Sequence, residues 1–263
     1  MAGLGIALVV IAAAAVAAQG QGPAPGTAAP ATPRAAAPVD LTGQWVAVIT
    51  EDWRWRMVTP AKGDYASIPL TPAAMRVADA WDPARDQAAG EQCRSYGAPA
   101  LMRAPTRLRF TWLDDSTLRM ESDYGMQTRL LHFSPRPAAN PRPGWQGEST
   151  ARWVMAAGGR GGGGQGGGGQ AAAVPAPRFG SLKTTTTRLR PGYLRKNGVP
   201  YSANTVLTEY WAVHRETDGS VYLVVTITVD DPANLQLPWI TAMHFRKETD
   251  TAKWDPTPCS PTW

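Results

Sequence analysis

The chain has 263 residues and a formal net charge of +5, from 26 basic and 21 acidic side chains spread along its length. Spread charge gives little support to a polyanion partner, so we expect no nucleic-acid binding. Residues 39–263 suffice for one large β domain or for two small ones.

An apolar stretch without a charged side chain lies near the start, from Leu4 to Ala18. It has the length of a secretory core, is shorter than the roughly 20 residues that span a bilayer, and ends in small residues that suit cleavage. We therefore predict a signal peptide over 1–18, a periplasmic or secreted protein, and no stable membrane insertion after cleavage. No basic residue precedes the apolar run, so an uncleaved membrane anchor remains the alternative.

The next segment, 19–38, is rich in proline and alanine. It holds too little bulky apolar surface to offset the entropy of ordering it, which predicts a disordered linker. A second low-complexity segment lies within 156–178, where a glycine tract separates two predicted strands. We interpret it as a disordered loop inserted in a hairpin.

Two elements are predicted before residue 83. Residues 46–50 are rich in β-branched side chains, directly follow Trp45 and indicate the first strand. Residues 71–82 predict a short helix, because Thr71 can cap it and Pro72 suits its first position. Between them, Trp53 and Trp55 alternate with two arginines, which on an extended chain places both indoles on one face, as at a rim where a ligand stacks.

The rest of the chain is predicted to be β almost throughout. Alternating apolar and polar residues, broken by turn residues, indicate these strands: 107–113, 117–124, 126–133, 145–155, 181–190, 205–215, 221–229 and 239–246. So many strands with little helix predict a barrel or a sandwich, and closure would remove exposed edges. We predict a mainly β chain: a single antiparallel β-barrel of about 8 to 10 strands with one short helix.

A basic cluster and two cysteines need separate mention. Arg195 and Lys196 follow Arg188 and Arg190 around a Pro-Gly turn, which is typical of a solvated hairpin end. Cys93 and Cys259 have neither CxxC spacing nor a neighbouring histidine, so a disulfide is favoured over a metal site. Such a bridge would tie the end of the chain to its first third, as expected of one domain.

Residues 42–45, Thr-Gly-Gln-Trp, resemble the G-x-W opening of lipocalin-type calycin barrels, in which the tryptophan packs across the closed end. The order of three later blocks, around 144–149, 198–202 and 229–232, is similar to that in a large uncharacterised family of bacterial exported proteins. The likeness covers roughly residues 40–260. It implies an exported, lipocalin-like β fold and no particular reaction.

The chain has 11 tryptophans, whose indoles suit the wall of a ligand cavity as well as a packed core. The residues we predict to bind a ligand combine five of them with one carboxylate: Trp45, Trp53, Trp55, Trp112, Trp211 and Glu209. Packing of the tryptophans in the core is the alternative.

Glu209 shares a predicted face with Leu207 and Trp211, and a carboxylate in apolar surroundings can act as a general acid or base. Together with His214 it is the candidate catalytic pair. The alternative is a structural ion pair with an arginine such as Arg188 or Arg129.

The three histidines each fall late in a predicted strand: His132, His214 and His244. Their convergence on zinc or copper is a minor hypothesis, since strand parity directs neither His214 nor His244 clearly inward. We predict no cofactor and no metal. No GxSxG motif supports nucleophilic hydrolysis.

Three functions remain open from the sequence. The first is an exported barrel that binds a small apolar or aromatic molecule. The second is a cofactor-independent lyase, isomerase or hydrolase on the same barrel, and the third is a structural envelope protein without a ligand. A cavity would favour the binding protein or the enzyme over the structural protein. A contact between Glu209 and a histidine would favour the enzyme over the binding protein. The oligomeric state is open.

Overall fold

The computed structural model describes residues 1, 31–50, 52–134, 143–155 and 179–263. The predicted signal peptide, the linker up to residue 30 and the glycine loop 156–178 lie outside these residues. Every helix and strand among the described residues belongs to the second of two units in the chain, Ala31–Trp263. No helix among the described residues combines the length and the apolar character needed to cross a bilayer.

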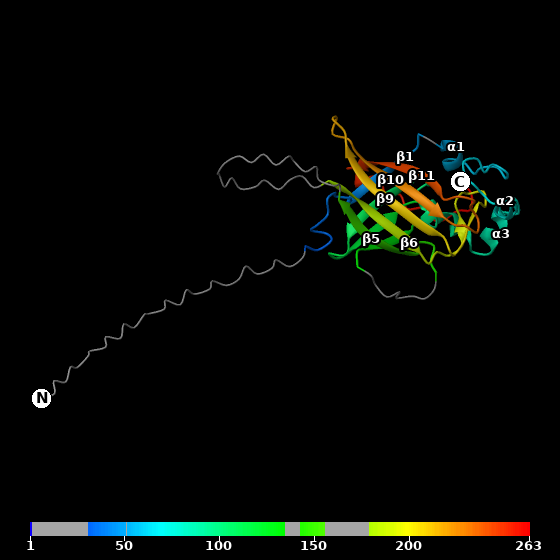
Figure 1. Ribbon diagram of the computed structural model, residues 1–263. Coiled ribbons are helices and arrows are strands. Elements are labelled where there is room, and N and C mark those ends of the chain that lie inside the picture. The colour runs from blue at the N-terminus through cyan, green and yellow to red at the C-terminus, as the bar shows by residue number, and fades with distance from the viewer. Residues whose placement is uncertain (2–30, 51, 135–142, 156–178) are drawn as a thin grey trace. The chain divides into compact units, whose positions relative to one another are not determined.

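Nine strands close into one barrel, in the order β1-β11-β10-β9-β6-β5-β4-β3-β2 (Figure 1). The ring is complete because β1 pairs on one side with β11 and on the other with β2. This confirms the predicted mainly β barrel. The bounds of the strands are β1 Gly43–Val48, β2 Arg107–Trp112, β3 Thr117–Ser122, β4 Thr128–His132, β5 Glu148–Met155, β6 Gly180–Thr187, β9 Val206–Arg215, β10 Val221–Asp230 and β11 Trp239–Glu248.

One pairing departs from the antiparallel prediction. Strands β4 and β5 run parallel and pair Leu131 with Ser149 and His132 with Thr150. Parallel neighbours need a long crossover in place of a tight turn, and the proline-rich stretch between β4 and β5 supplies that length. A separate two-stranded sheet is formed by β7 (Gly192–Tyr193) and β8 (Pro200–Tyr201).

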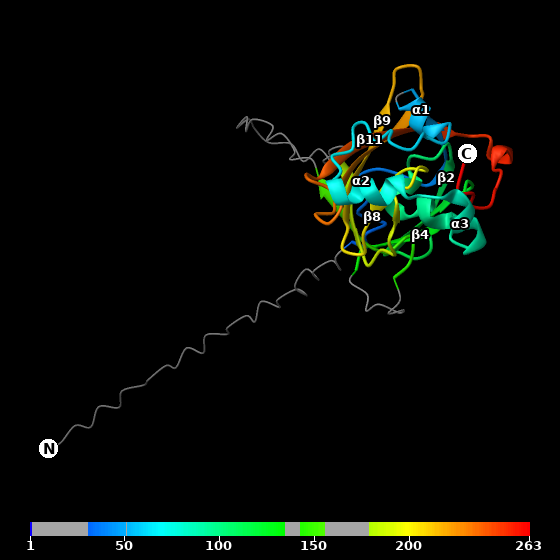
Figure 2. The ribbon, with the colours of Figure 1, turned by 90° about the vertical axis from the view of Figure 1, so that its right-hand side faces the viewer.

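In the described part of the chain, four short α-helices precede β2, where one was predicted: α1 Trp53–Arg56, α2 Pro72–Asp79, α3 Pro83–Ala88 and α4 Ala98–Leu101. The predicted helix is α2, whose Thr71 Oγ1 accepts a hydrogen bond from Ala74 N at 3.1 Å. The others span one or two turns, too few for a helical period to appear in the sequence. Figures 1 and 2 place α1, α2 and α3 together at one end of the barrel, and we call residues 52–104 the cap.

A disulfide joins the cap to the last residues of the chain. Cys93, in the 3₁₀-helix η1 (Gln92–Tyr96), is bonded to Cys259, with a Cα–Cα distance of 5.1 Å. This confirms the predicted bridge. In the chain-entropy model, a loop of this length stabilises the folded state by about 5 kcal/mol. A second 3₁₀-helix, η2 (Thr251–Lys253), lies between β11 and Cys259.

The folded domain begins earlier than the predicted linker allows. Trp153 Nε1 donates to the carbonyl oxygen of Pro33 at 2.7 Å, and Arg34 N donates to that of Asp115 at 3.0 Å. Residues 31–38 therefore pack on the barrel domain, which corrects the boundary of the linker. The reason is that backbone hydrogen bonds order this segment, although it has few bulky apolar side chains.

Side chains of the protein itself occupy the barrel interior. Trp45, Trp211, Phe110 and Phe245 are each at most 1% exposed and belong to one core cluster. Phe110 and Trp211 meet edge to face with ring centroids 5.8 Å apart. The interior is thus packed like an ordinary protein core, which favours the packing alternative for these tryptophans.

Candidate functional site

Glu209 lies inside the barrel, paired with an arginine from the opposite wall. Arg129 on β4 makes a two-pronged contact with Glu209 on β9: Nη1 donates to Oε1 at 3.0 Å and Nη2 donates to Oε2. The side chains are 1% and 0% exposed. Of the two alternatives for Glu209, the geometry therefore favours the structural ion pair.

Hydroxyl groups complete this network. Arg129 Nε donates to Ser149 Oγ at 2.9 Å, and Thr184 Oγ1 donates to Glu209 Oε2 at 2.8 Å. Trp211 Nε1 in turn donates to Thr184 Oγ1 at 3.1 Å. Every nitrogen of the guanidinium group and both carboxylate oxygens are thereby engaged, which offsets the cost of burying two charges.

The candidate catalytic pair is not brought together. Glu209 faces the interior, whereas His214, five positions further along the same strand, is on the exposed outer face. An odd separation on a strand directs two side chains to opposite faces, so the two groups cannot meet. His132 and His244 also lie at outward positions of β4 and β11. Among the described residues, no group of three metal-ligating side chains is assembled.

The predicted ligand-binding tryptophans are dispersed. Trp45 and Trp211 are buried in the core, and Trp112 packs against Phe133 with ring centroids 5.4 Å apart. Trp53 is 62% exposed on the cap. Trp55 lines a pocket beside the buried Arg103, Arg195 and Lys196.

The predicted strand alternation at 53–56 is wrong, because these residues form helix α1. On a helix, positions two apart do not share a face, so the two indoles diverge. Arg56 is fully buried, and its Nε donates to the carbonyl oxygen of Arg103 at 3.0 Å. Trp55 Nε1 donates to Asp64 Oδ2 at 2.9 Å.

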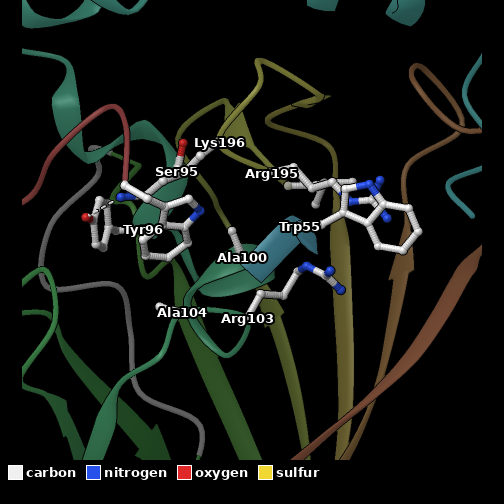
Figure 3. A pocket seen from close by; sticks show the side chains of 10 residues that line it. Trp55, Ser95, Tyr96, Ala100, Arg103, Ala104, Arg195 and Lys196 are labelled. Atoms are coloured by element: carbon white, nitrogen blue, oxygen red, sulfur yellow. Dashed lines mark hydrogen bonds between the residues drawn. The ribbon is translucent and has the colours of Figure 1, made fainter. Parts of the chain in front are cut away.

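The predicted solvated hairpin end is also wrong for Arg195 and Lys196, which are 2% and 3% exposed. Both line a pocket under the cap, shown in Figure 3. In this view the Arg103 and Arg195 side chains extend toward Trp55, while Lys196 lies near Tyr96 on the other side. The free space in this cap pocket is about 10 Å³, room for about one water molecule.

Arg195 is held between an aromatic ring and a like charge. Its guanidinium carbon lies 4.4 Å from the centroid of the Trp55 ring, and its Nη2 donates to Ser67 Oγ at 3.0 Å. Burial, followed by the nearby charge of Arg103, lowers the pKa of Arg195 to about 10. Its Nε and Nη1 are buried and have no hydrogen-bond partner among the described residues.

Arg103 reaches the cap pocket from the end of α4. Its Nη2 lies 3.2 Å from Asp52 Oδ2, and its guanidinium carbon lies 5.2 Å from the centroid of the Trp239 ring. The partners of both arginines, Asp52 and Ser67, adopt left-handed backbone conformations, with φ of 56° and 65°. Such conformations cost about 1 kcal/mol or more outside glycine and concentrate at functional sites.

Lys196 is caged by aromatic rings. Its Nζ lies 3.9 Å from the centroid of the Trp263 ring and 4.5 Å from that of Tyr96. It donates to Tyr96 Oη at 2.7 Å and to the carbonyl oxygens of Ser260 and Thr262 at 2.9 and 3.1 Å. Burial lowers the pKa of Lys196 to about 7. All three ammonium donors are used, so this lysine fastens the end of the chain to the cap.

A larger groove lies beside the two arginines. It has a volume of about 310 Å³ and runs along β11, where Trp239, Ile240, Ala242 and His244 form one wall. Asp52 and Ser67 of the cap form the other. The same two side chains hydrogen-bond Arg103 and Arg195, so each arginine is one contact away from the groove.

The fold and this site define a class of protein: a disulfide-linked closed β-barrel, packed internally, with an open groove beside a basic, tryptophan-containing pocket under a helical cap. Comparison with known proteins gives no closer identification. No protein-family model matches the chain, and neither a curated protein nor a solved structure matches it.

Sequence reasoning missed most of this site. Arg103 lies in a segment with no strand or helix pattern, and Arg195 stands in a basic cluster that resembles a solvated turn. Trp239 was one of several tryptophans on predicted strands, with nothing to distinguish it. The available signal was the pair Trp55 and Arg195, aromatic and basic residues that suit stacking, but their contact spans 140 positions and only the fold reveals it.

Proposed function

We propose that this protein is an exported, lipocalin-like barrel that binds a small, largely apolar or aromatic molecule. The binding site we propose is the groove between β11 and the cap, in place of the barrel interior. The observation that carries the proposal is the groove's volume of about 310 Å³ beside an exposed isoleucine and a tryptophan. That volume is at the lower end of the range for small-molecule sites.

The lining supports a ligand with an apolar body. Ile240 is 65% exposed, so its side chain offers apolar surface to a ligand in the groove. Trp239 is almost buried beneath the Arg103 guanidinium group, so its indole forms part of the groove's wall. A planar or aliphatic ligand body laid along these side chains would remove their apolar surface from water.

Export is part of the proposal and has its own support. The bond between Cys93 and Cys259 is of the kind that persists in oxidising compartments and is rare in the cytosol. It agrees with the predicted signal peptide over 1–18. Protein recovered from a secreting host, with its first residue read by mass spectrometry, tests the cleavage directly.

Binding is tested with a neutral aromatic dye, N-phenyl-1-naphthylamine, whose fluorescence rises in apolar surroundings. We expect Ala242→Trp, which fills the groove, to weaken dye binding by about tenfold or more, equivalent to about 1.4 kcal/mol. Ala212→Trp is the matched control, because Ala212 is also half-buried at an outward strand position but lies on β9, outside the groove.

Equal dye binding by the two variants would exclude the groove as the site. Absence of dye binding by the unmodified protein would instead favour the alternative of a structural envelope protein that binds no ligand.

A further inference from the structure

We infer that a hollow in the outer wall of the barrel binds the phosphate group of a phosphate monoester between Arg152 and Lys183. This wall hollow has a volume of about 210 Å³ and is lined by residues of β4, β5 and β6 and by Phe133, which follows β4. It shares no lining residue with the groove along β11, so the inference goes beyond the proposed function and does not depend on it.

The wall hollow lies at a step between two strands. The ladder between β4 and β5 ends where His132 meets Thr150, while β5 continues to Met155. Phe133 donates its backbone N–H to the carbonyl oxygen of Ser116, so it stays beside the hairpin formed by β2 and β3. The hollow is therefore found where β4 ends next to a longer strand.

Two cations face each other at the wall hollow. Arg152 on β5 is directly opposite Lys183 on β6 in the antiparallel ladder, and Figure 1 shows these two strands side by side. Side chains in such positions have Cβ atoms about 4.5–5.5 Å apart, and like charges there destabilise a sheet. An anion between the two side chains would replace this repulsion by two attractions.

The described residues supply no carboxylate for this pair. No acidic residue lines the wall hollow, and none of the ion pairs among the described residues includes Arg152 or Lys183. Glu148, the acidic residue of β5, pairs with Arg188 at 3.0 Å, and β6 contains no acidic residue. The Lys183 ammonium group lies 5.2 Å from the centroid of the Tyr210 ring. The site thus offers two positive charges to an anion from outside.

The remaining lining combines hydroxyl groups with an apolar side. Thr150 and Thr185 are opposite each other in the same ladder, two positions from the cations, and so bring hydroxyl groups to the same face of the sheet. Phe133 gives the wall hollow an aromatic side and is backed by Trp153, with ring centroids 5.0 Å apart. An ester, which has an apolar body beside its charged group, matches this lining better than a free inorganic ion.

Charge and size select the group that binds. A phosphate monoester carries about −1.5 to −2 charges at pH 7 and has three acceptor oxygens, which matches two cations and neighbouring hydroxyl groups. A carboxylate or a sulfate monoester carries only one negative charge. The volume of about 210 Å³ is below the roughly 300–1,000 Å³ of sites that enclose a whole drug-sized ligand, so the hollow suits a head group and the start of its body.

Binding of phenyl phosphate is measured by isothermal titration calorimetry at pH 7.5 and low ionic strength. Phenyl sulfate has the same body and less charge, and inorganic phosphate has the charge without the body. We expect phenyl phosphate to bind about tenfold more tightly than either, and Arg152→Met and Lys183→Met each to weaken its binding by about tenfold. Arg246→Met is the matched control, because Arg246 is an exposed arginine at an outward position of β11, outside the wall hollow.

Lys183→Glu separates a lost site from a lost fold. It places a carboxylate opposite Arg152, so phenyl phosphate binding should disappear while the midpoint of thermal unfolding rises by about 2 °C. A midpoint several degrees lower would assign Lys183 to the scaffold and overturn the inference.

Absence of phenyl phosphate binding by the unmodified protein would overturn the inference. An equal loss of binding in Arg152→Met and Arg246→Met would also overturn it, because overall charge would then account for the attraction. Phenyl sulfate binding as tightly as phenyl phosphate would overturn the phosphate assignment, and inorganic phosphate binding as tightly would overturn the ester. Ala242→Trp, which fills the groove, should leave phenyl phosphate binding unchanged, so a failure of this inference is distinguishable from a failure of the proposed function.

Discussion

Two clusters of buried charge in this protein, one around Arg129 inside the barrel and one around Arg195 under the cap, differ in how far their hydrogen-bond donors are engaged. Inside the barrel, Arg129 meets one carboxylate and two hydroxyl groups, and all its nitrogens are engaged. Under the cap, Arg195 meets one hydroxyl group and the face of Trp55, beside the like charge of Arg103. All donors of the interior arginine are engaged, whereas Nε and Nη1 of Arg195 have no hydrogen-bond partner among the described residues.

This difference predicts that the two arginines contribute differently to stability. A saturated network resists change because each member satisfies another, so it specifies one arrangement of the strands. A buried cation whose donors lack partners lowers the stability of the folded protein. We therefore expect substitutions in the two clusters to have opposite effects on stability, and three experiments sharpen the contrast.

The largest effect is expected inside the barrel. Glu209→Leu removes the partner of Arg129 and leaves a fully buried charge uncompensated, which should lower the free energy of unfolding by about 3–5 kcal/mol. Chemical denaturation measures the loss. The double variant Arg129→Met with Glu209→Leu should recover most of it, since neither charge remains. A single variant as stable as the unmodified protein would refute the structural role of the pair.

The second effect concerns Lys196 and pH. Its pKa is about 7 in the folded protein, below its ordinary value of 10.5, so between these two pH values the unfolded chain binds more protons. The free energy of unfolding should therefore increase with pH across this window, by about 2 kcal/mol after allowance for the rings that favour the charged form. Below pH 7 this gain is absent.

Denaturation at pH 6.5 and pH 9.5 measures this effect, with Lys196→Met as the reference. The unmodified protein should gain stability over this reference between the two pH values. Parallel pH profiles would mean that the aromatic cage and the three carbonyl and hydroxyl acceptors hold the lysine charged throughout.

The smallest effect, and of opposite sign, is expected for Arg195→Met. Removing a buried guanidinium group with open donors should leave the free energy of unfolding unchanged or raise it by about 1 kcal/mol, although the contact with Trp55 is lost. Thermal unfolding without ligand measures it. A loss of several kcal/mol would assign Arg195 to the scaffold and remove the distinction between the two clusters.

The predictable part of the molecule is the part with regular local patterns. The alternation of apolar and polar residues predicted the long strands to within a few residues. Thr71 and Pro72, which are typical of a helix N-terminus, located α2. The cysteine pair followed from spacing and composition. Helix α1 was misread as extended, because four residues cannot distinguish a period of two from one turn of helix.

The candidate site was less accessible to prediction. Parity placed Glu209 on an inward face, and Arg129 was named among its possible partners, but the two strands are not neighbours in the sheet. Arg103 and Arg195 lie in loops without periodicity, where burial is decided by what packs above them. The residues next to them in the sequence do not predict that packing.

The sequence by itself determined the strands, the N-terminus of helix α2 and the disulfide, because each depends on neighbouring residues or on the chemistry of one residue type. The tertiary structure alone decided which charges are buried, which are paired and where open space remains. Those properties depend on contacts between segments far apart in the chain, and in this barrel the same residue type, arginine, is sealed in one place and left with open donors in another.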